Sequence, residues 1–134
     1  MNAPSESPPR AIVYHRDERT LELDYGGPDK ALLTAELLRV YSPSAEVRGH
    51  SETERVLQTG KKYVAIEEVT AVGNYAIRIV FDDGHDTGIY SWGFLKDLYE
   101  RRDEYWQDYL AELSKANASR LPTIPIGQWT PPDR

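Results

Sequence analysis

The residues of this chain with the clearest capacity for chemistry lie between Asp82 and Trp92. This segment holds Asp83, His85 and Asp86 together with two glycines and two aromatic residues. A histidine beside carboxylates can act as a general acid or base, or can bind a metal. The same residues also suit a hairpin turn in which the carboxylates accept backbone hydrogen bonds and the histidine packs over the turn. The sequence favours the structural interpretation and leaves the chemical one open.

A second polar segment, from Ser42 to His50, contains two serines and Arg48. Arg48 and His50 could bind an anion, although a capped turn that enters a solvated loop explains the same residues. If the two segments meet in space, Arg48, His50 and His85 would form a cationic, pH-sensitive patch suited to an acidic protein.

Composition limits the classes of function. With 134 residues, 40% hydrophobic and 28% charged, the chain is expected to form one soluble domain. A net charge of −6 argues against a general nucleic-acid or anionic-membrane binder, because such proteins need a basic face to neutralise phosphates. The absence of cysteine excludes disulfides, thiolate zinc sites and iron–sulfur ligation. Neither a signal peptide nor an apolar run of the roughly 20 residues that span a bilayer is visible, so we expect a cytoplasmic protein.

The first half of the chain shows the pattern of short strands followed by a helix. Residues 12–14 and 20–25 have strand character, the second with strict alternation, and residues 30–33 form a third candidate strand. Thr34 can cap a helix over 35–40, which Pro43 prevents from continuing. Residues 45–62 are polar and are expected to form a long loop.

The second half contains strands and then helical periodicity. Strands are predicted at 63–72, 75–81 and 87–90, with turns at Gly73-Asn74 and Asp83-Gly84. Apolar residues from Trp92 to about Lys115 recur with helical spacing and predict one long helix. This order predicts an α+β fold with a small antiparallel-rich sheet, a short helix and a long C-terminal helix packed on one face. Residues 1–10 are expected to be a disordered leader, 11–117 a single domain and 118–134 a proline-rich disordered tail.

Three ordered motifs carry a family resemblance. The segments are residues 38–50, residues 72–75 and residues 83–92. Together they resemble the gamma-butyrobetaine hydroxylase-like N-terminal domain family over about residues 10–115. That family includes small stand-alone bacterial proteins of unknown function and the N-terminal module of carnitine-synthesis oxygenases. It also includes a module attached to some Mrp-type P-loop ATPases that carry iron–sulfur clusters.

The resemblance also concerns a metal site. In the oxygenases this module binds a structural zinc through three cysteines and one later histidine, and the matching positions here are Ser42, Ser44, Val47 and His85. A serine hydroxyl is a poor zinc ligand and valine offers no donor atom, so we expect no bound zinc and no other cofactor. The oxygenases' catalytic iron site lies in a separate C-terminal domain, so the resemblance does not imply oxygenase activity here.

The sequence therefore predicts a non-catalytic accessory module that binds a protein partner or a small ligand, and neither nucleic acid nor membrane. It leaves the oligomeric state open, and family association suggests docking near iron–sulfur or P-loop ATPase proteins. The predicted binding surface comprises Tyr41, Arg48, His50, Asp83, His85, Asp86, Tyr90 and Trp92. The alternative is a small enzyme in which His85 is the acid or base and Asp83 or Asp86 orients it.

Overall fold

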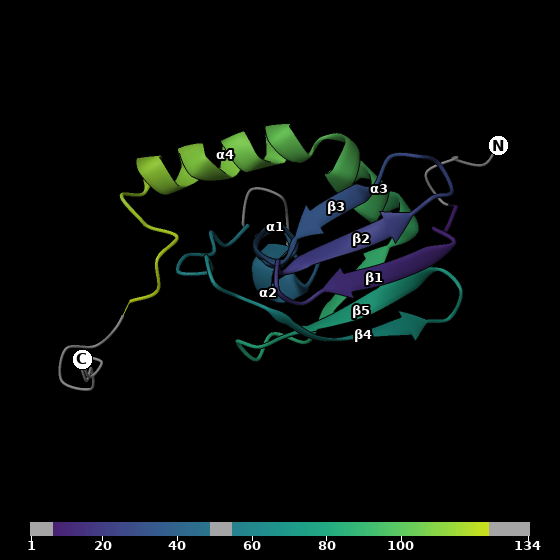
Figure 1. The fold of residues 1–134 in the computed structure, drawn as a ribbon. Helices are drawn as coiled ribbons and strands as arrows, with labels where there is room; N and C mark the ends of the chain where they lie inside the picture. The colour runs from purple at the N-terminus through teal and green to yellow at the C-terminus, as the bar shows by residue number, and fades with distance from the viewer. Residues whose placement is uncertain (1–6, 49–54, 124–134) are drawn as a thin grey trace, which may run out of the picture.

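Two three-stranded antiparallel sheets form the frame of the protein (Figure 1). The structure is a computed structural model that describes residues 7–48 and 55–123. The first sheet has the order β1 (Ala11–His15), β2 (Thr20–Asp24), β3 (Ala31–Thr34), and the second β4 (Ile66–Val72), β5 (Ala76–Phe81), β6 (Gly88–Ser91). Along the chain, helices α1 (Ala35–Val40) and α2 (Ala45–Arg48) come after the first sheet and before the second. Helices α3 (Trp92–Glu100) and α4 (Arg102–Lys115) follow the second sheet. The predicted α+β class is confirmed.

Four features differ from the prediction. The strands form two sheets rather than one, and the expected loop over 45–62 contains α2. The predicted helix over 92–115 is two helices, because Arg101 leaves the helical region with φ −113° and ψ 24°. The strand expected at 63–72 begins only at Ile66, with a bulge between Ile66 and Glu68.

Each sheet is built from neighbouring segments of the chain. In the first sheet, Leu21 of β2 lies opposite Tyr14 of β1 and Leu33 of β3. In the second sheet, Gly73 turns β4 into β5 with a φ of +54°, a conformation that glycine adopts without steric cost. Both sheets are therefore meanders whose turns follow directly from local sequence.

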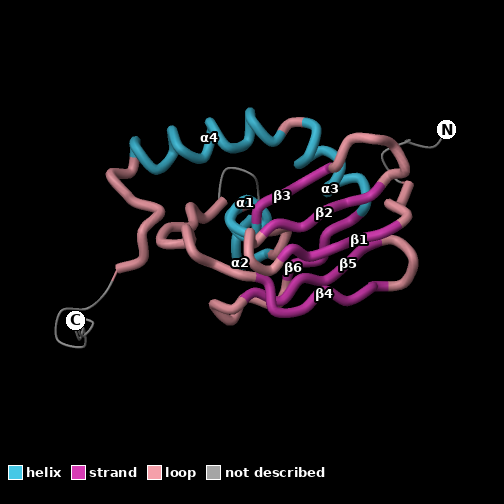
Figure 2. Tube along the Cα trace, viewed as in Figure 1, coloured by secondary structure: helices cyan, strands magenta, loops and turns pink. Residues whose placement is uncertain are grey.

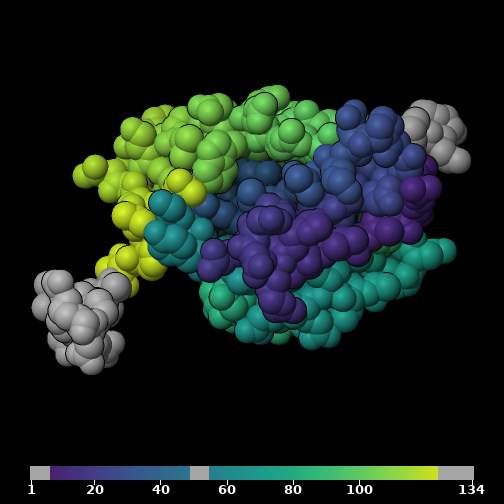
Figure 3. Space-filling model, in the orientation of Figure 1, coloured from purple at the N-terminus to yellow at the C-terminus, as the bar shows by residue number. Residues whose placement is uncertain are grey.

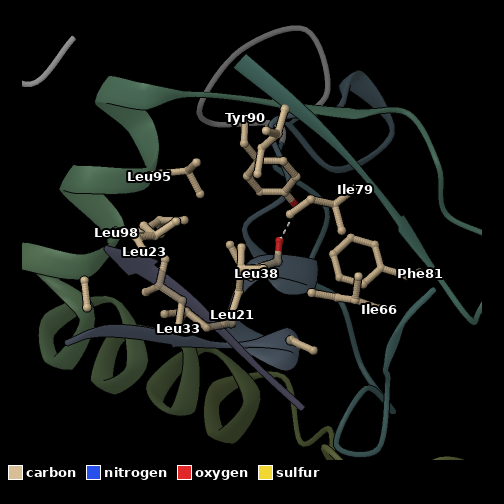
Figure 4. Packing of buried hydrophobic residues seen from close by; sticks show 14 of the residues in the cluster. Leu21, Leu23, Leu33, Leu38, Ile66, Ile79, Phe81, Tyr90, Leu95 and Leu98 are labelled. Carbon is tan, nitrogen blue, oxygen red and sulfur yellow. Dashed lines mark hydrogen bonds between the residues drawn. The ribbon is translucent and has the colours of Figure 1, made fainter. Parts of the chain in front are cut away.

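The main hydrophobic core lies between the two sheets and α3. Figure 4 shows leucines of the first sheet and of α3 meeting Ile66, Ile79 and Phe81 of the second sheet. Tyr90 enters the same core, and its hydroxyl donates to the carbonyl of Leu38 at 2.5 Å. The aromatic residue of β6 is therefore fastened to α1 across the core.

The helices occupy defined places around the sheets. Helix α1 begins where predicted, because the Thr34 hydroxyl accepts the Leu37 N–H at 3.1 Å. Helices α1 and α2 lie together at one end of the sheets (Figure 2). Helix α4 packs Tyr109 and Leu113 against Val40 in a second, smaller cluster. No helix among the described residues is long and apolar enough to cross a membrane.

The described ends of the chain contact the domain. Within the predicted tail, residues 118–123 run beside residues 60–62, and Arg120 makes a bidentate ion pair with Glu36 at 2.8 and 2.7 Å. Figure 3 shows this yellow segment against the teal one. Arg10, at the end of the predicted leader, donates its N–H to Asp24 at 2.7 Å. The packed unit thus extends past residue 117, and residues 1–6 and 124–134 lie outside the described part.

Candidate functional site

The site follows from the way the β5–β6 hairpin closes over the turn between α1 and α2. Gly84, with a φ of +93°, turns the chain after Phe81, and the Phe81 N–H donates to the His85 carbonyl at 2.9 Å. This turn directs the His85 side chain inward, where only 5% of the residue is exposed. His85 thereby reaches residues that lie about 40 positions earlier in the chain.

His85 stands between a serine and a glutamate. Its Nε2 lies 2.8 Å from the Ser42 hydroxyl, and its Nδ1 lies 3.0 Å from Oε1 of Glu46. Because the carboxylate can only accept, Nδ1–H donates to Glu46, and Nε2 of the neutral ring accepts from Ser42. The order serine, histidine, glutamate is that of a nucleophile, its base and the group that orients the base.

The exposure of this trio is the reverse of what nucleophilic catalysis needs. Ser42 is fully buried, whereas 65% of the Glu46 side chain is exposed. Gly88 packs so closely that a Cβ there would lie 2.6 Å from the Ser42 hydroxyl oxygen. The same oxygen accepts the Ser44 N–H at 3.2 Å. The hydroxyl is therefore held in a closed hydrogen-bond network, away from solvent.

The electrostatics keep the imidazole neutral. Burial lowers the pKa of His85 below its ordinary value, and the nearby Arg39 cation lowers it further. Glu46 and Asp83 oppose this shift. A buried neutral imidazole that both donates and accepts is a structural connector between the hairpin and α2.

A second hydrogen bond joins the same two segments. The hydroxyls of Ser44 and Thr87 lie 2.6 Å apart, and the Ser44 hydroxyl accepts the Glu46 N–H at 3.1 Å. Val47, the buried residue of α2, donates its N–H to the Ser44 carbonyl at 2.9 Å. The short helix α2 is thus fixed by its own first turn and by the hairpin.

Asp83 is the centre of a separate charged cluster. Its carboxylate accepts from Lys61 at 2.6 Å, from the His85 backbone N–H at 3.1 Å and from Arg39 at 2.8 Å. Burial raises the pKa of Asp83, but these donors outweigh it and lower the pKa to about 2. Asp83 therefore binds the backbone of His85, and the imidazole contacts Glu46 instead.

The remaining predicted residues are spread over several contacts. Tyr90 lies fully in the core, Tyr41 donates to the Tyr105 carbonyl at 2.9 Å and Trp92 donates to the Asn74 carbonyl at 2.9 Å. Asp86 pairs with Arg78 at 3.4 Å. The guanidinium of exposed Arg48 lies 5.1 Å from the centre of the Phe94 ring. His50 lies outside the described residues.

Two expectations need correction. Tyr90 and His85 lie beneath the surface, because the hairpin folds over them, so neither side chain can be part of an exposed patch. In the enzyme alternative, Asp83 or Asp86 orients the His85 imidazole. Asp83 instead accepts the His85 backbone N–H and Asp86 pairs with Arg78, so the carboxylate bonded to the imidazole is that of Glu46.

Sequence reasoning missed Glu46, Arg39 and Lys61. Glu46 and Lys61 fall in the segment expected to be a loop, so no periodicity marked them. Arg39 sits in an apolar helix, yet its side chain is only 8% exposed. A charged residue on the buried face of a short apolar helix was the available signal that a carboxylate partner exists elsewhere.

Of the four positions matched to zinc ligands, Ser42, Ser44 and His85 lie together, but their side chains do not suit a metal. Ser42 bonds His85, Ser44 bonds Thr87, and Val47 offers no donor atom. Both imidazole nitrogens of His85 are engaged. Within residues 7–48 and 55–123, no group of three or more histidine, cysteine or acidic side chains could hold a metal ion. The residues therefore do not fit the structural zinc.

Comparisons with known proteins agree with this architecture. The family model described as "Gamma-butyrobetaine hydroxylase-like, N-terminal" matches residues 12–96. Two NMR solution structures are similar, at 47% identity with a TM-score of 0.76, and at 49% with a TM-score of 0.74. The first match covers 91% of this chain and 96% of the other, and the second 92% and 93%.

A crystal structure is also similar, that of a protein with unknown function of the DUF971 family from Acidithiobacillus ferrooxidans. The identity is 35% and the TM-score 0.58, over 72% of this chain and 97% of the other. A comparison with curated proteins gave no match.

Proposed function

We propose that this chain, which belongs to the gamma-butyrobetaine hydroxylase-like N-terminal family, is a non-catalytic module that binds a protein partner. The similar DUF971 protein is itself of unknown function. The observation that carries the proposal is the burial of the chemically capable residues. Ser42 is fully buried, and His85 uses both ring nitrogens to join α2 to the hairpin. Side chains used in this way support a surface and do not act on a substrate.

The surface that they support is the proposed docking site. It consists of the exposed residues Glu46 and Arg48 of α2 with Asp86 and Ile89 of the hairpin, and we call it the α2–β6 surface. Ile89 is 39% exposed and lies opposite Arg78 of β5, which pairs with Asp86, so an apolar group lies near charges of both signs. Aliphatic side chains surrounded by charged ones are common in protein interfaces, where the charges set orientation.

We also propose that the hydrogen bonds of Ser42, Ser44 and His85 take the place that zinc has in the related oxygenase modules. Both arrangements would hold the α1–α2 turn to the segment around His85. By family association, the partner belongs to the iron–sulfur or P-loop ATPase context, where a cysteine-free chain could dock but could not carry a cluster.

Affinity capture from native lysate, with quantification of the captured proteins, tests the docking site. Ile89→Glu and Arg48→Glu change exposed positions of the α2–β6 surface and should remove the specifically captured proteins. Val13→Glu is the matched control, because Val13 is 44% exposed on β1 of the other sheet. Retention of the same proteins by Ile89→Glu and Arg48→Glu would contradict the proposal.

The enzyme alternative is favoured by one observation, the serine–histidine–glutamate order. A serine-reactive fluorophosphonate, followed by peptide mass spectrometry, distinguishes the two. The binding-module proposal predicts no labelling of Ser42 in the native protein. Labelling of Ser42 that disappears in His85→Gln would support the enzyme, since the imidazole would then be the activating base.

A further inference from the structure

A cavity of about 440 Å³ lies between β3 and the first turns of α4, away from the α2–β6 surface. Leu32, Leu33 and Leu37 line it from β3 and α1, and Trp106 lines it from α4. Its volume falls within the range of roughly 300 to 1,000 Å³ found for small-molecule sites. None of its lining residues takes part in the His85 network.

The walls of the cavity are partly apolar and reachable from solvent. Leu32 is 40% exposed and stands outside the core, whereas Leu33 beside it is buried. Trp106 is half-buried and presents its ring next to Arg120, whose guanidinium lies 4.9 Å from the ring centre. An aromatic or aliphatic group could therefore displace water from Leu32 and Trp106, and this displacement would lower the free energy.

The lining of the cavity holds three cationic side chains and two carboxylates. Lys30, Arg102 and Arg120 line it together with Glu36 and Asp103. Glu36 is already bound by two donors of Arg120. Arg102 lies 4.9 Å from the centre of the Tyr99 ring and makes no ion pair with any residue that the structure describes.

This lining is unusual for a chain with a net charge of −6. Arg102, with its five donors, can bind a carboxylate or sulfonate in a bidentate manner. Lys30 lies on the opposite wall and adds a second positive charge, although it also pairs with Glu22 at 3.3 Å.

We propose that this cavity binds a small amphipathic organic anion, with an apolar body on Leu32 and Trp106 and its charged group toward Arg102 and Lys30. The apolar walls supply affinity, and the cationic side chains select the charge. The inference is independent of the protein-docking proposal, because the two surfaces share no residue.

A pair of dyes tests the proposal with the full-length protein. The fluorescent sulfonate 1-anilinonaphthalene-8-sulfonate carries an anion on an aromatic body, and N-phenyl-1-naphthylamine is the same body without the sulfonate. We expect saturable one-to-one binding of the sulfonate, at least roughly fivefold tighter than the neutral dye, as one partly exposed charge-assisted contact would give. Equal or tighter binding of the neutral dye would overturn the anionic part of the proposal.

Matched variants locate the site. Arg102→Gln should weaken binding of the sulfonate roughly three- to tenfold and leave the neutral dye unchanged. Leu32→Glu should weaken both dyes, whereas Ile89→Glu, at a similarly exposed residue of β6 in the other sheet, should weaken neither. Equal effects of Leu32→Glu and Ile89→Glu, or chemical-shift changes in NMR spectra confined to residues away from β3 and α4, would refute this location. Thermal unfolding of each variant verifies that it is folded before titration.

Discussion

His85 shows how a residue type that suggests catalysis can be used for structure. Its imidazole is placed between a buried hydroxyl and an exposed carboxylate, and both nitrogens are satisfied. A buried polar group of this kind stabilises a fold mainly because the alternative, a buried group without a partner, is costly. Its loss should therefore be measurable as a loss of stability.

We predict that His85→Ala lowers the free energy of unfolding by about 2–4 kcal/mol, from a cavity and an unpaired Ser42 hydroxyl. Urea unfolding followed by circular dichroism measures the change. Asp86→Ala, at the next residue and on the surface, should cost less than about 1 kcal/mol. Equal losses of unfolding free energy in the two variants would show that the His85 network adds no more to stability than a surface contact.

The pH dependence of stability follows from the lowered pKa of His85. Glu46, Arg39 and Asp83 face the imidazole, and burial with Arg39 holds the folded-state pKa below the unfolded value near 6.5. The unfolded state then binds more protons below that pH, so this stability is present above pH 6.5 and is lost as the pH falls toward the folded pKa. Unfolding free energies at pH 7.5 and 5.5 should differ more in the natural protein than in His85→Gln.

Asp83 titrates in a separate and more acidic range. Its pKa of about 2 lies below the ordinary carboxyl value of 3.8, so its contribution is present above about pH 4 and is lost between there and pH 2. Asp83→Asn should remove the part of acid unfolding that occurs in this range, with little effect between pH 5.5 and 7.5. If Asp83→Asn altered stability only between pH 5.5 and 7.5, the attribution of the acid range to Asp83 would be wrong.

At the scale of elements, the hairpin and the α1–α2 turn fit together with almost no spare space. Gly88 has no positive φ, so its requirement for glycine is steric alone: a Cβ would meet the Ser42 hydroxyl at 2.6 Å and the Tyr90 ring at 3.0 Å. Both neighbours are fully buried and cannot move away easily.

We expect Gly88→Ala to destabilise the protein by about 1–3 kcal/mol, the usual cost of overpacking a filled core. Gly27→Ala is the control, because a Cβ there meets nothing within 4 Å and its φ lies outside the left-handed region. That variant should be neutral or slightly stabilising. Differential scanning calorimetry of both proteins makes the comparison, and a tolerated Gly88→Ala would show that the hairpin can lift from the turn.

The ion pair of Arg120 and Glu36 fastens the segment after α4 to α1. Glu36 is buried, so its carboxylate needs these donors, and Arg120→Ala should cost about 2–3 kcal/mol. Arg101→Ala also removes an arginine with two carboxylate partners, but these lie at the surface, and the cost should stay below about 1 kcal/mol. Chemical denaturation of the two variants gives the comparison.

The elements were largely predictable where local signals decide them. Thr34 and Pro43 bracket α1, and Gly73 marks the turn between β4 and β5, so these features follow from sequence. The break at Arg101 was missed, although the apolar phase changes there: Tyr99 is followed by Arg102 and Asp103 where a continuous helix would place apolar residues. The division into two sheets could not be derived, because it depends on packing between distant segments.

At the scale of the whole molecule, the candidate site depends on contacts that no local pattern encodes. The meeting of Ser42 with His85 was suggested only by the family resemblance, and Glu46 was not anticipated.

The proposed replacement of zinc by hydrogen bonds leads to a test on the intact protein. Addition of zinc or of a chelator should leave the melting temperature unchanged, because Ser42, Ser44 and Val47 offer no thiolate. Stoichiometric sub-micromolar binding that raises the melting temperature would contradict this.

The Ser42–His85 hydrogen bond has a consequence for the order of folding. Each sheet is a meander of neighbouring strands and can form from nearby residues, whereas this bond joins positions 43 residues apart. Closing so long a segment has an entropic cost that the short turns do not have. The two sheets should therefore form before they join, and hydrogen exchange at His85 and Ser44 should report the joining step rather than the formation of either sheet.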